Sequence, residues 1–226
     1  VPGRGGLVLE LPVTSLPARE VVMAPLPAAS WDFEDGAQGW TAQGGLWQRG
    51  EPATSGLGPG DAFDGAWCWG VGLDGGGYPD QAAGELWSPL LQGADHVGER
   101  MQLSLHYWCG TEPGFDGVHV VMNPGPDAQV LAPFGDYTDP VLGGLGHRPG
   151  WSGDSGGWRT AVFDLTDQFD ATDWRVAVRF GSDQAVGGEG FLIDGVTLHA
   201  FDVATPVAPA PSATAATLGA WPNPFN

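Results

Sequence analysis

The chain has 226 residues, a formal net charge of −19 and eight basic residues, all of them arginine. A chain this acidic repels phosphate backbones and anionic lipid surfaces, so we expect no nucleic-acid partner. No apolar stretch approaches the roughly 20 residues of a membrane span, so we expect no span. The 11 tryptophans and 42% hydrophobic residues exclude a disordered acidic chain and predict a packed core.

Residues 1–28 are predicted to be an extended N-terminal arm. Its two short apolar runs are separated and followed by prolines, which disfavour a helix or a central strand. Such a segment can add to an open sheet edge of a neighbouring copy of the chain. The predicted assembly residues are Leu7, Val8, Leu9, Leu11, Val21 and Val22.

Residues 29–201 are predicted to be one all-β domain. Short apolar runs alternate with Gly, Asp and Pro, and several runs show the two-residue period of a strand with one buried face. Many short strands separated by turn residues favour a β-sandwich. The expected strands are 31–33, 66–71, 84–87, 101–109, 117–122, 157–164, 175–180 and 190–200, with long loops at 92–100 and 123–157.

From residue 202 to 226 the composition changes to Pro, Ala and Thr, which is typical of an extended linker. This segment ends in Trp-Pro-Asn-Pro-Phe-Asn at 221–226. The last five residues resemble the opening of the PNPFN-type C-terminal sorting domain of bacterial surface proteins.

An ordered set of motifs resembles the MAM-like domain of bacterial secreted proteins, as found beside immune inhibitor A-type M6 metalloproteases. The resemblance implies a jelly-roll sandwich of two antiparallel sheets and an extracellular or cell-surface location. It does not imply protease activity, because the HExxH zinc motif is absent. The motifs are Trp31 to Gly36, Cys68-Trp69-Gly70, Leu86 to Leu90, Leu103 to Trp108, Gly157-Trp158 and Gly190 to Leu198.

The two cysteines, Cys68 and Cys109, are predicted to form a disulfide. A secreted protein meets an oxidising environment, where such bridges persist. The alternative is a pair of buried free thiols.

A structural calcium ion is predicted between the first and last strands of the sandwich. Glu34 and Asp194 are the expected ligands, with Asp32 or Asp64, because carboxylate oxygens suit calcium. In the alternative interpretation, Asp194 caps a turn with Gly195 and Glu34 hydrogen-bonds to the backbone.

The aromatic residues fall into two predicted groups. Six tryptophans are expected to pack between the sheets, namely Trp40, Trp69, Trp87, Trp108, Trp158 and Trp174. Trp47, Tyr137 and Trp151 lie in loop-like contexts and are the candidate sugar-stacking residues, with a polysaccharide as ligand.

We expect no enzymatic activity, since Ser152 or Ser155, His147 and Asp154 form no nucleophile-elbow motif. The leading hypothesis is an extracellular structural protein, a homo-oligomeric subunit of a filament, sheath or surface layer assembled through the terminal arms. The alternative is a carbohydrate- or protein-binding adhesion module of a larger secreted protein.

Overall fold

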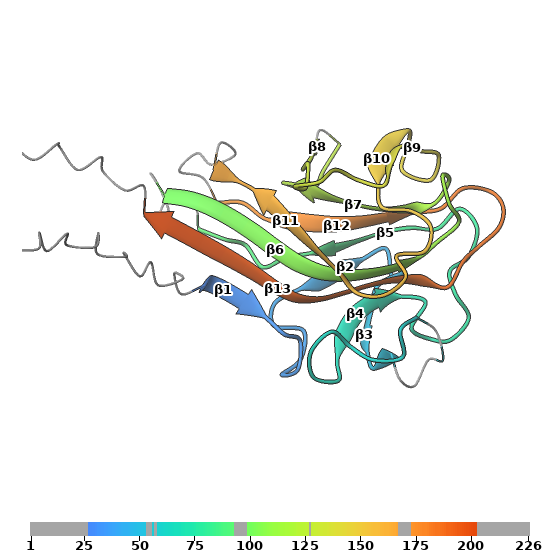
Figure 1. Ribbon diagram of the computed structural model, residues 1–226, viewed down its shortest axis with the longest axis horizontal. Coiled ribbons are helices and arrows are strands. Elements are labelled where there is room, and N and C mark those ends of the chain that lie inside the picture. The colour runs from blue at the N-terminus through green and yellow to red at the C-terminus, as the bar shows by residue number, and fades with distance from the viewer. Residues whose placement is uncertain are drawn as a thin grey trace, which may run out of the picture.

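The computed structural model describes residues 27–52, 56, 58–92, 99–126, 128–166 and 173–202. These residues form strands, most of which are arranged in two facing sheets (Figure 1). The strands are β1 (Pro27–Trp31), β2 (Thr41–Gln43), β3 (Gln48–Gly50), β4 (Cys68–Val71), β5 (Ala83–Trp87), β6 (Glu99–Gly110), β7 (Gly117–Met122), β8 (Gln129–Val130), β9 (Asp139–Leu142), β10 (Arg148–Gly150), β11 (Arg159–Asp164), β12 (Val176–Gly181) and β13 (Gly190–Asp202).

The two main sheets are antiparallel and form a jelly-roll sandwich. The six-stranded sheet has the order β11-β6-β13-β4-β3, with β1 also paired to β13, and the five-stranded sheet has the order β2-β5-β12-β7-β8. From β4 to β7, and again from β11 to β13, consecutive strands alternate between the two sheets. The expected all-β sandwich is therefore confirmed.

The long strands β6 and β13 pair along most of their length and form the middle of the six-stranded sheet. Leu103, Leu105 and Tyr107 alternate with polar neighbours on β6 and point into the core. On β13, Phe191 and Ile193 also point into the core, while Leu192 between them packs on the outer face of the sheet. The interior is thus filled by aromatic and branched side chains from both sheets, which supply most of the buried apolar area.

The disulfide prediction is wrong, because Cys68 and Cys109 are both buried free thiols. Strand β13 lies between β4 and β6, so the two cysteines are two strands apart. Two strand spacings are about 9.6 Å, beyond the roughly 7 Å that a disulfide spans between Cα atoms. The thiols also lie on opposite faces, since Cys109 belongs to the interior core and Cys68 to the outer cluster with Trp108 and Leu192.

Residues 123–157 are not a plain loop, because they contain β8, β9 and β10. Strands β9 and β10 form a hairpin that folds over one end of the five-stranded sheet, where Leu142 and Leu145 are buried. The close approach needs glycine, since a Cβ on Gly181 would collide with the carbonyl of Gly144.

Three of the tryptophans predicted to lie between the sheets do so, namely Trp40, Trp69 and Trp174. Trp108 and Trp158 instead pack on the outer face of the six-stranded sheet. Trp87 is half-buried at the surface of the five-stranded sheet. Since side chains alternate along a strand, a one-residue difference in phase moves a residue from core to surface.

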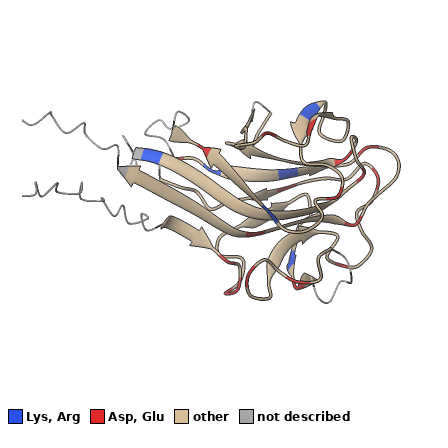
Figure 2. Ribbon diagram, viewed as in Figure 1, with Lys and Arg blue, Asp and Glu red and all other residues tan. Residues whose placement is uncertain are grey.

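Charge is distributed unevenly over the elements. Acidic side chains lie mainly in the loops, whereas most of the described arginines lie on strands (Figure 2). Among the described residues, no helix is long and apolar enough to cross a membrane. Strand β1 begins at Pro27, and the predicted assembly residues Leu7, Val8, Leu9, Leu11, Val21 and Val22 lie outside the described residues, as does 221–226.

Candidate functional site

The candidate site lies on the outer face of the five-stranded sheet. Strand alternation points Glu85 and Trp87 of β5 away from the core, while Leu86 points into it. In register, Trp87 lies opposite Ala177, and Glu85 lies opposite Arg179 on β12. The sheet therefore presents an aromatic ring and a charged pair side by side.

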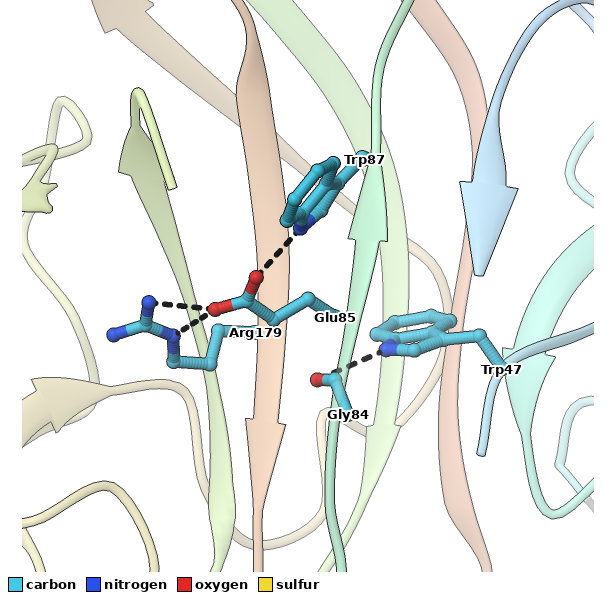
Figure 3. Close-up of polar contacts among 5 residues, drawn as sticks. All are labelled: Trp47, Gly84, Glu85, Trp87 and Arg179. Atoms are coloured by element: carbon cyan, nitrogen blue, oxygen red, sulfur yellow. Dashed lines mark hydrogen bonds and ion pairs between the residues drawn. The ribbon is translucent and has the colours of Figure 1, made fainter. Parts of the chain in front are cut away.

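Three of these side chains are bonded to one another (Figure 3). The indole N–H of Trp87 donates to Glu85 Oε2 at 2.5 Å, and Nε of Arg179 donates to Glu85 Oε1 at 2.6 Å. Arg179 Nη2 also lies 2.5 Å from Glu85 Oε1. The side chains of Arg179 and Glu85 are 30% and 20% exposed, so the pair is partly shielded yet reachable. Such charge-assisted contacts hold the three groups in one arrangement.

The surface around Trp87 is extended by its neighbours. The guanidinium carbon of Arg175 lies over the indole, 5.3 Å from the ring centroid. Strand β2 adds the exposed side chains of Thr41, opposite Trp87, and Gln43, opposite Glu85. These residues, with Glu85 and Arg179, are called here the Trp87 face.

One side of the Trp87 face ends at the β9–β10 hairpin. His119 lies opposite Arg179 and is fully buried there, with Nδ1 donating to the carbonyl of Pro149 at 2.9 Å. Burial lowers the pKa of His119 to about 4, so the ring is neutral at pH 7. In the described part of the chain, its Nε2 has no hydrogen-bond partner.

The aromatic residues proposed from the sequence are not exposed stacking surfaces. Trp47 and Trp151 are each 3% exposed and belong to the interior core, so this expectation is wrong for both. The indole of Trp47 donates to the carbonyl of Gly84 (Figure 3). Tyr137 is half-buried, and its hydroxyl donates to the Leu131 carbonyl and accepts from the Val120 amide.

Glu34 and Asp194, the predicted calcium ligands, both bind the loop of residues 63–67. Asp194 Oδ2 accepts the amides of Phe63 and Asp64 at 3.0 and 3.1 Å, and Oδ1 accepts the amide of Gly195. Glu34 Oε1 accepts the amides of Ala66 and Trp67. This is the arrangement of the alternative interpretation, in which both carboxylates accept hydrogen bonds from the backbone.

The other predicted ligands, Asp32 and Asp64, accept hydrogen bonds from residues near them in the sequence. Asp32 Oδ1 accepts from Gln38, which lowers the pKa of Asp32, and Asp64 Oδ1 accepts the amide of Gly65. Calcium binding by this set stays a prediction. In the described ranges, the three carboxylates that do converge are a different group, Glu112, Asp116 and Asp183, whose ligand atoms lie within 4.8 Å of one another.

This carboxylate group is built around a buried residue. Asp116 accepts from the Tyr78 hydroxyl at 2.8 Å and from the Asp183 amide at 2.7 Å. Burial, followed by the neighbouring carboxylates, raises the pKa of Asp116 and of Glu112. The protonation of Glu112 and Asp116 therefore depends on the neighbouring carboxylates. The buried Asp116 already receives hydrogen bonds from groups of the protein.

The serine residues considered for catalysis serve the backbone. Ser152 Oγ donates to the Glu112 carbonyl and Ser155 Oγ donates to the Gly157 carbonyl. Neither is hydrogen-bonded to His147 within the described ranges. These hydroxyls therefore stabilise loops through hydrogen bonds to backbone carbonyls.

Trp87 was not expected from the sequence as a surface residue. The signal was present, because 175–180 alternates with Arg175 and Arg179 on the polar face, and the alternation of 84–87 allows Trp87 to share that face. What the sequence lacks is the register that brings β12 beside β5.

The comparisons with known proteins give likenesses of fold at low sequence identity. No family model and no curated protein matches the chain. Among solved structures, the chain is similar to the CBM22-1 xylan-binding domain of Paenibacillus barcinonensis Xyn10C. The identity is 16%, the match covers 80% of this chain and 98% of that one, and the TM-score is 0.48.

A second similar structure is the K1 cleaved adhesin domain of Lys-gingipain from Porphyromonas gingivalis, with 16% identity, 76% and 96% coverage and a TM-score of 0.44. The CBM22-1–GH10 modules of Clostridium thermocellum xylanase 10B match at 14% identity, with 83% of this chain and 30% of that one covered and a TM-score of 0.45. The function proposed below therefore rests on the residues of this chain.

Proposed function

We propose that this domain is a non-catalytic extracellular binding module that holds a polysaccharide on the Trp87 face. The observation that carries the proposal is Trp87 itself. Its indole is half-buried on the outer face of a sheet, and its N–H already donates to Glu85. The accessible part of the ring therefore offers apolar and π contact.

The chemistry around Trp87 suits a polyhydroxylated chain. Sugar rings have apolar C–H faces that pack on an aromatic ring and hydroxyls that both donate and accept hydrogen bonds. The Trp87 face supplies donors in Arg179 and Arg175, an acceptor in Glu85, and both kinds of group in Thr41 and Gln43.

The site is also organised in advance of binding. Trp87, Glu85 and Arg179 stand on paired strands and are bonded to one another, so they lose little side-chain freedom when a ligand arrives. A strand-borne face is open along its length, which suits internal units of a long chain. Extended polymers are therefore the expected ligands of this face.

The filament hypothesis rests on terminal arms that lie outside the described residues. The geometry of the described residues favours the binding module, which was the alternative from the sequence. Location at the bacterial cell surface is part of the same proposal, since polysaccharides of walls and of the surroundings are found there.

Affinity electrophoresis through gels containing soluble polysaccharides tests the proposal. Wild-type protein should be retarded by at least one of xylan, β-glucan or mannan, and Trp87→Ala should weaken retention about 5- to 150-fold, since an aromatic contact contributes roughly 1–3 kcal/mol. Because Trp87 lies at the surface of the sheet and outside the interior core, the melting temperature of the variant should change little.

Trp158→Ala is the matched control, because Trp158 is also half-buried but packs on the opposite sheet. It should bind as the wild type does. Retention that is equal in wild type and Trp87→Ala, or absent for every polymer, would contradict the proposal.

A further inference from the structure

A hollow lies at the edge of the sandwich, away from the Trp87 face. Two adjoining cavities of about 240 and 270 Å³ share Tyr107, Thr138, Trp151 and Arg159. They lie between β11 with the end of β6 on one side and the segments 133–138 and 151–155 on the other. Together they are called here the edge cleft, which approaches the size of small-molecule sites, roughly 300–1,000 Å³.

Tyr107 forms a fixed part of the wall of the edge cleft. Its ring is stacked on Trp151, with centroids 4.3 Å apart and planes at 20°, and on Phe191 at 5.6 Å and 3°. The residue is only 8% exposed and lines both cavities. Packing on two sides therefore fixes its position.

The hydroxyl of Tyr107 has no hydrogen-bond partner among the described residues. Its oxygen is not one of the buried unpaired atoms of the described residues, so it is open to the cleft, whereas the hydroxyls of the other two described tyrosines are paired within the protein. Burial raises the pKa of Tyr107 to about 12, so the hydroxyl keeps its proton at pH 7. The cleft thus contains a rigid donor without an internal acceptor.

Arg159 lies across from Tyr107 in the β6–β11 pair and shares its face of the sheet. Its Nε donates to the Ser155 carbonyl at 2.8 Å, which anchors the guanidinium at the cleft. Asp136 and Asp154 line the cavities as acceptors. Phe134, which is 63% exposed, adds an apolar lip.

From this geometry we infer that the edge cleft is a binding site for a single neutral sugar unit, which packs beside the exposed ring of Phe134 and is hydrogen-bonded by Tyr107 and Arg159. The carboxylates and the net charge of −19 disfavour an anion, while Arg159 disfavours a cation. Donors and acceptors beside aromatic rings match the hydroxyls of one sugar. The site does not depend on the Trp87 face.

Titration with methyl glycosides of glucose, galactose, mannose and xylose tests this inference, with binding followed by saturation-transfer NMR. At least one glycoside should bind at millimolar concentration. Tyr107→Phe should weaken that binding about fivefold, because it removes one hydrogen bond, without lowering the melting temperature. Arg159→Gln should weaken it by a similar factor.

Two control variants show whether the glycoside binds in the edge cleft. Arg100→Gln, which alters an exposed arginine with a long 4.0 Å ion pair to Asp164, should bind the glycoside normally. Trp87→Ala should also bind it normally, even where it loses polysaccharide retention.

Three results would overturn the inference. The first is no binding of any of the four glycosides at about 50 mM, which is too weak for a specific site. The second is unchanged binding in both Tyr107→Phe and Arg159→Gln. The third is loss of glycoside binding in Trp87→Ala alone, which would place the sugar on the sheet face and leave only the function proposed above.

Discussion

At the scale of single residues, the buried carboxyl of Asp194 makes the stability of the fold depend on pH. It is fully buried on β13, beside a bulge where one extra residue lies between Asp194 and Thr197. Burial raises its pKa to about 6, and the charge of Glu34 adds to the effect, although three amides donate to the carboxylate. The desolvation cost therefore exceeds the gain from these hydrogen bonds.

This shift predicts a pH-dependent effect of Asp194→Asn. Between pH 4 and 6 the folded wild type binds more protons than the unfolded chain, so Asp194 stabilises at low pH and loses that contribution as pH rises. Asparagine does not ionise, so the substitution removes this loss of stability. It also disturbs one hydrogen bond from a backbone amide, and this cost is the same at every pH. Relative to wild type, the free energy of unfolding of the variant should rise by about 2 kcal/mol between pH 4 and 7.

Urea unfolding of both proteins at several pH values measures this difference. Its subtraction cancels the other titrating groups, including His119, whose lowered pKa acts in the opposite direction. A constant difference across the pH range would show that Asp194 has an ordinary pKa.

At the scale of elements, β13 decides which side chains meet. It separates β4 from β6, pairs with β1 farther along the same edge and carries Asp194 toward the 63–67 loop. Residue patterns identify such a strand, as the predicted 190–200 shows. They do not say which strands lie on either side of it, and that order is what keeps the two cysteines apart.

The separated cysteines should behave as inert thiols. Burial raises the pKa of Cys109 to about 11 and raises that of Cys68 as well, so neither is a thiolate at pH 8. Ellman's reagent should label neither in the native state and both in guanidinium, and dithiothreitol should leave the melting temperature unchanged. A mass 2 Da below that of the reduced chain would instead reveal a disulfide.

Several parts of the fold could be predicted from sequence, and others could not. Seven of the eight expected strands coincide largely with β4, β5, β6, β7, β11, β12 and β13, because each has a clear apolar run or alternation, whereas the expected strand 31–33 shares only Trp31 with β1. The short strands β2, β3, β8, β9 and β10 have two to four residues and too little pattern to stand out from turns. Their existence depends on a partner strand distant in sequence.

The candidate site was less predictable for the same reason. Trp47 and Trp151 are flanked by glycine and polar residues, which suggested loops, yet tertiary packing buries both. Tyr107 belongs to an expected strand, but its unpaired hydroxyl follows only from the positions of Arg159 and the 151–155 segment. A sequence alone cannot show which hydroxyl lacks a partner.

At the scale of the whole molecule, the question is whether a cation offsets part of the charge of −19. Calcium at Glu34 and Asp194 would share these carboxylates with the loop amides that already donate to them. If calcium binds there, melting in EDTA should occur at a lower temperature than in calcium chloride.

Glu34→Gln should abolish that difference, while Glu112→Gln is the control at the separate carboxylate group. Identical melting of the wild type in EDTA and in calcium would remove the calcium prediction. A difference abolished only by Glu112→Gln would move the ion to that group.

The pairing of β1 with β13 has a mechanical consequence. Pro27 lies opposite His199, so the outer ends of these two antiparallel strands lie at the same pole of the sandwich (Figure 1). Tension applied between Pro27 and Asp202 would load the hydrogen bonds one after another, as in opening a zipper, rather than shear them together. Strand β1 would therefore peel away first at low force and pull Trp31 from the interior, while the sheet carrying Trp87 stayed intact.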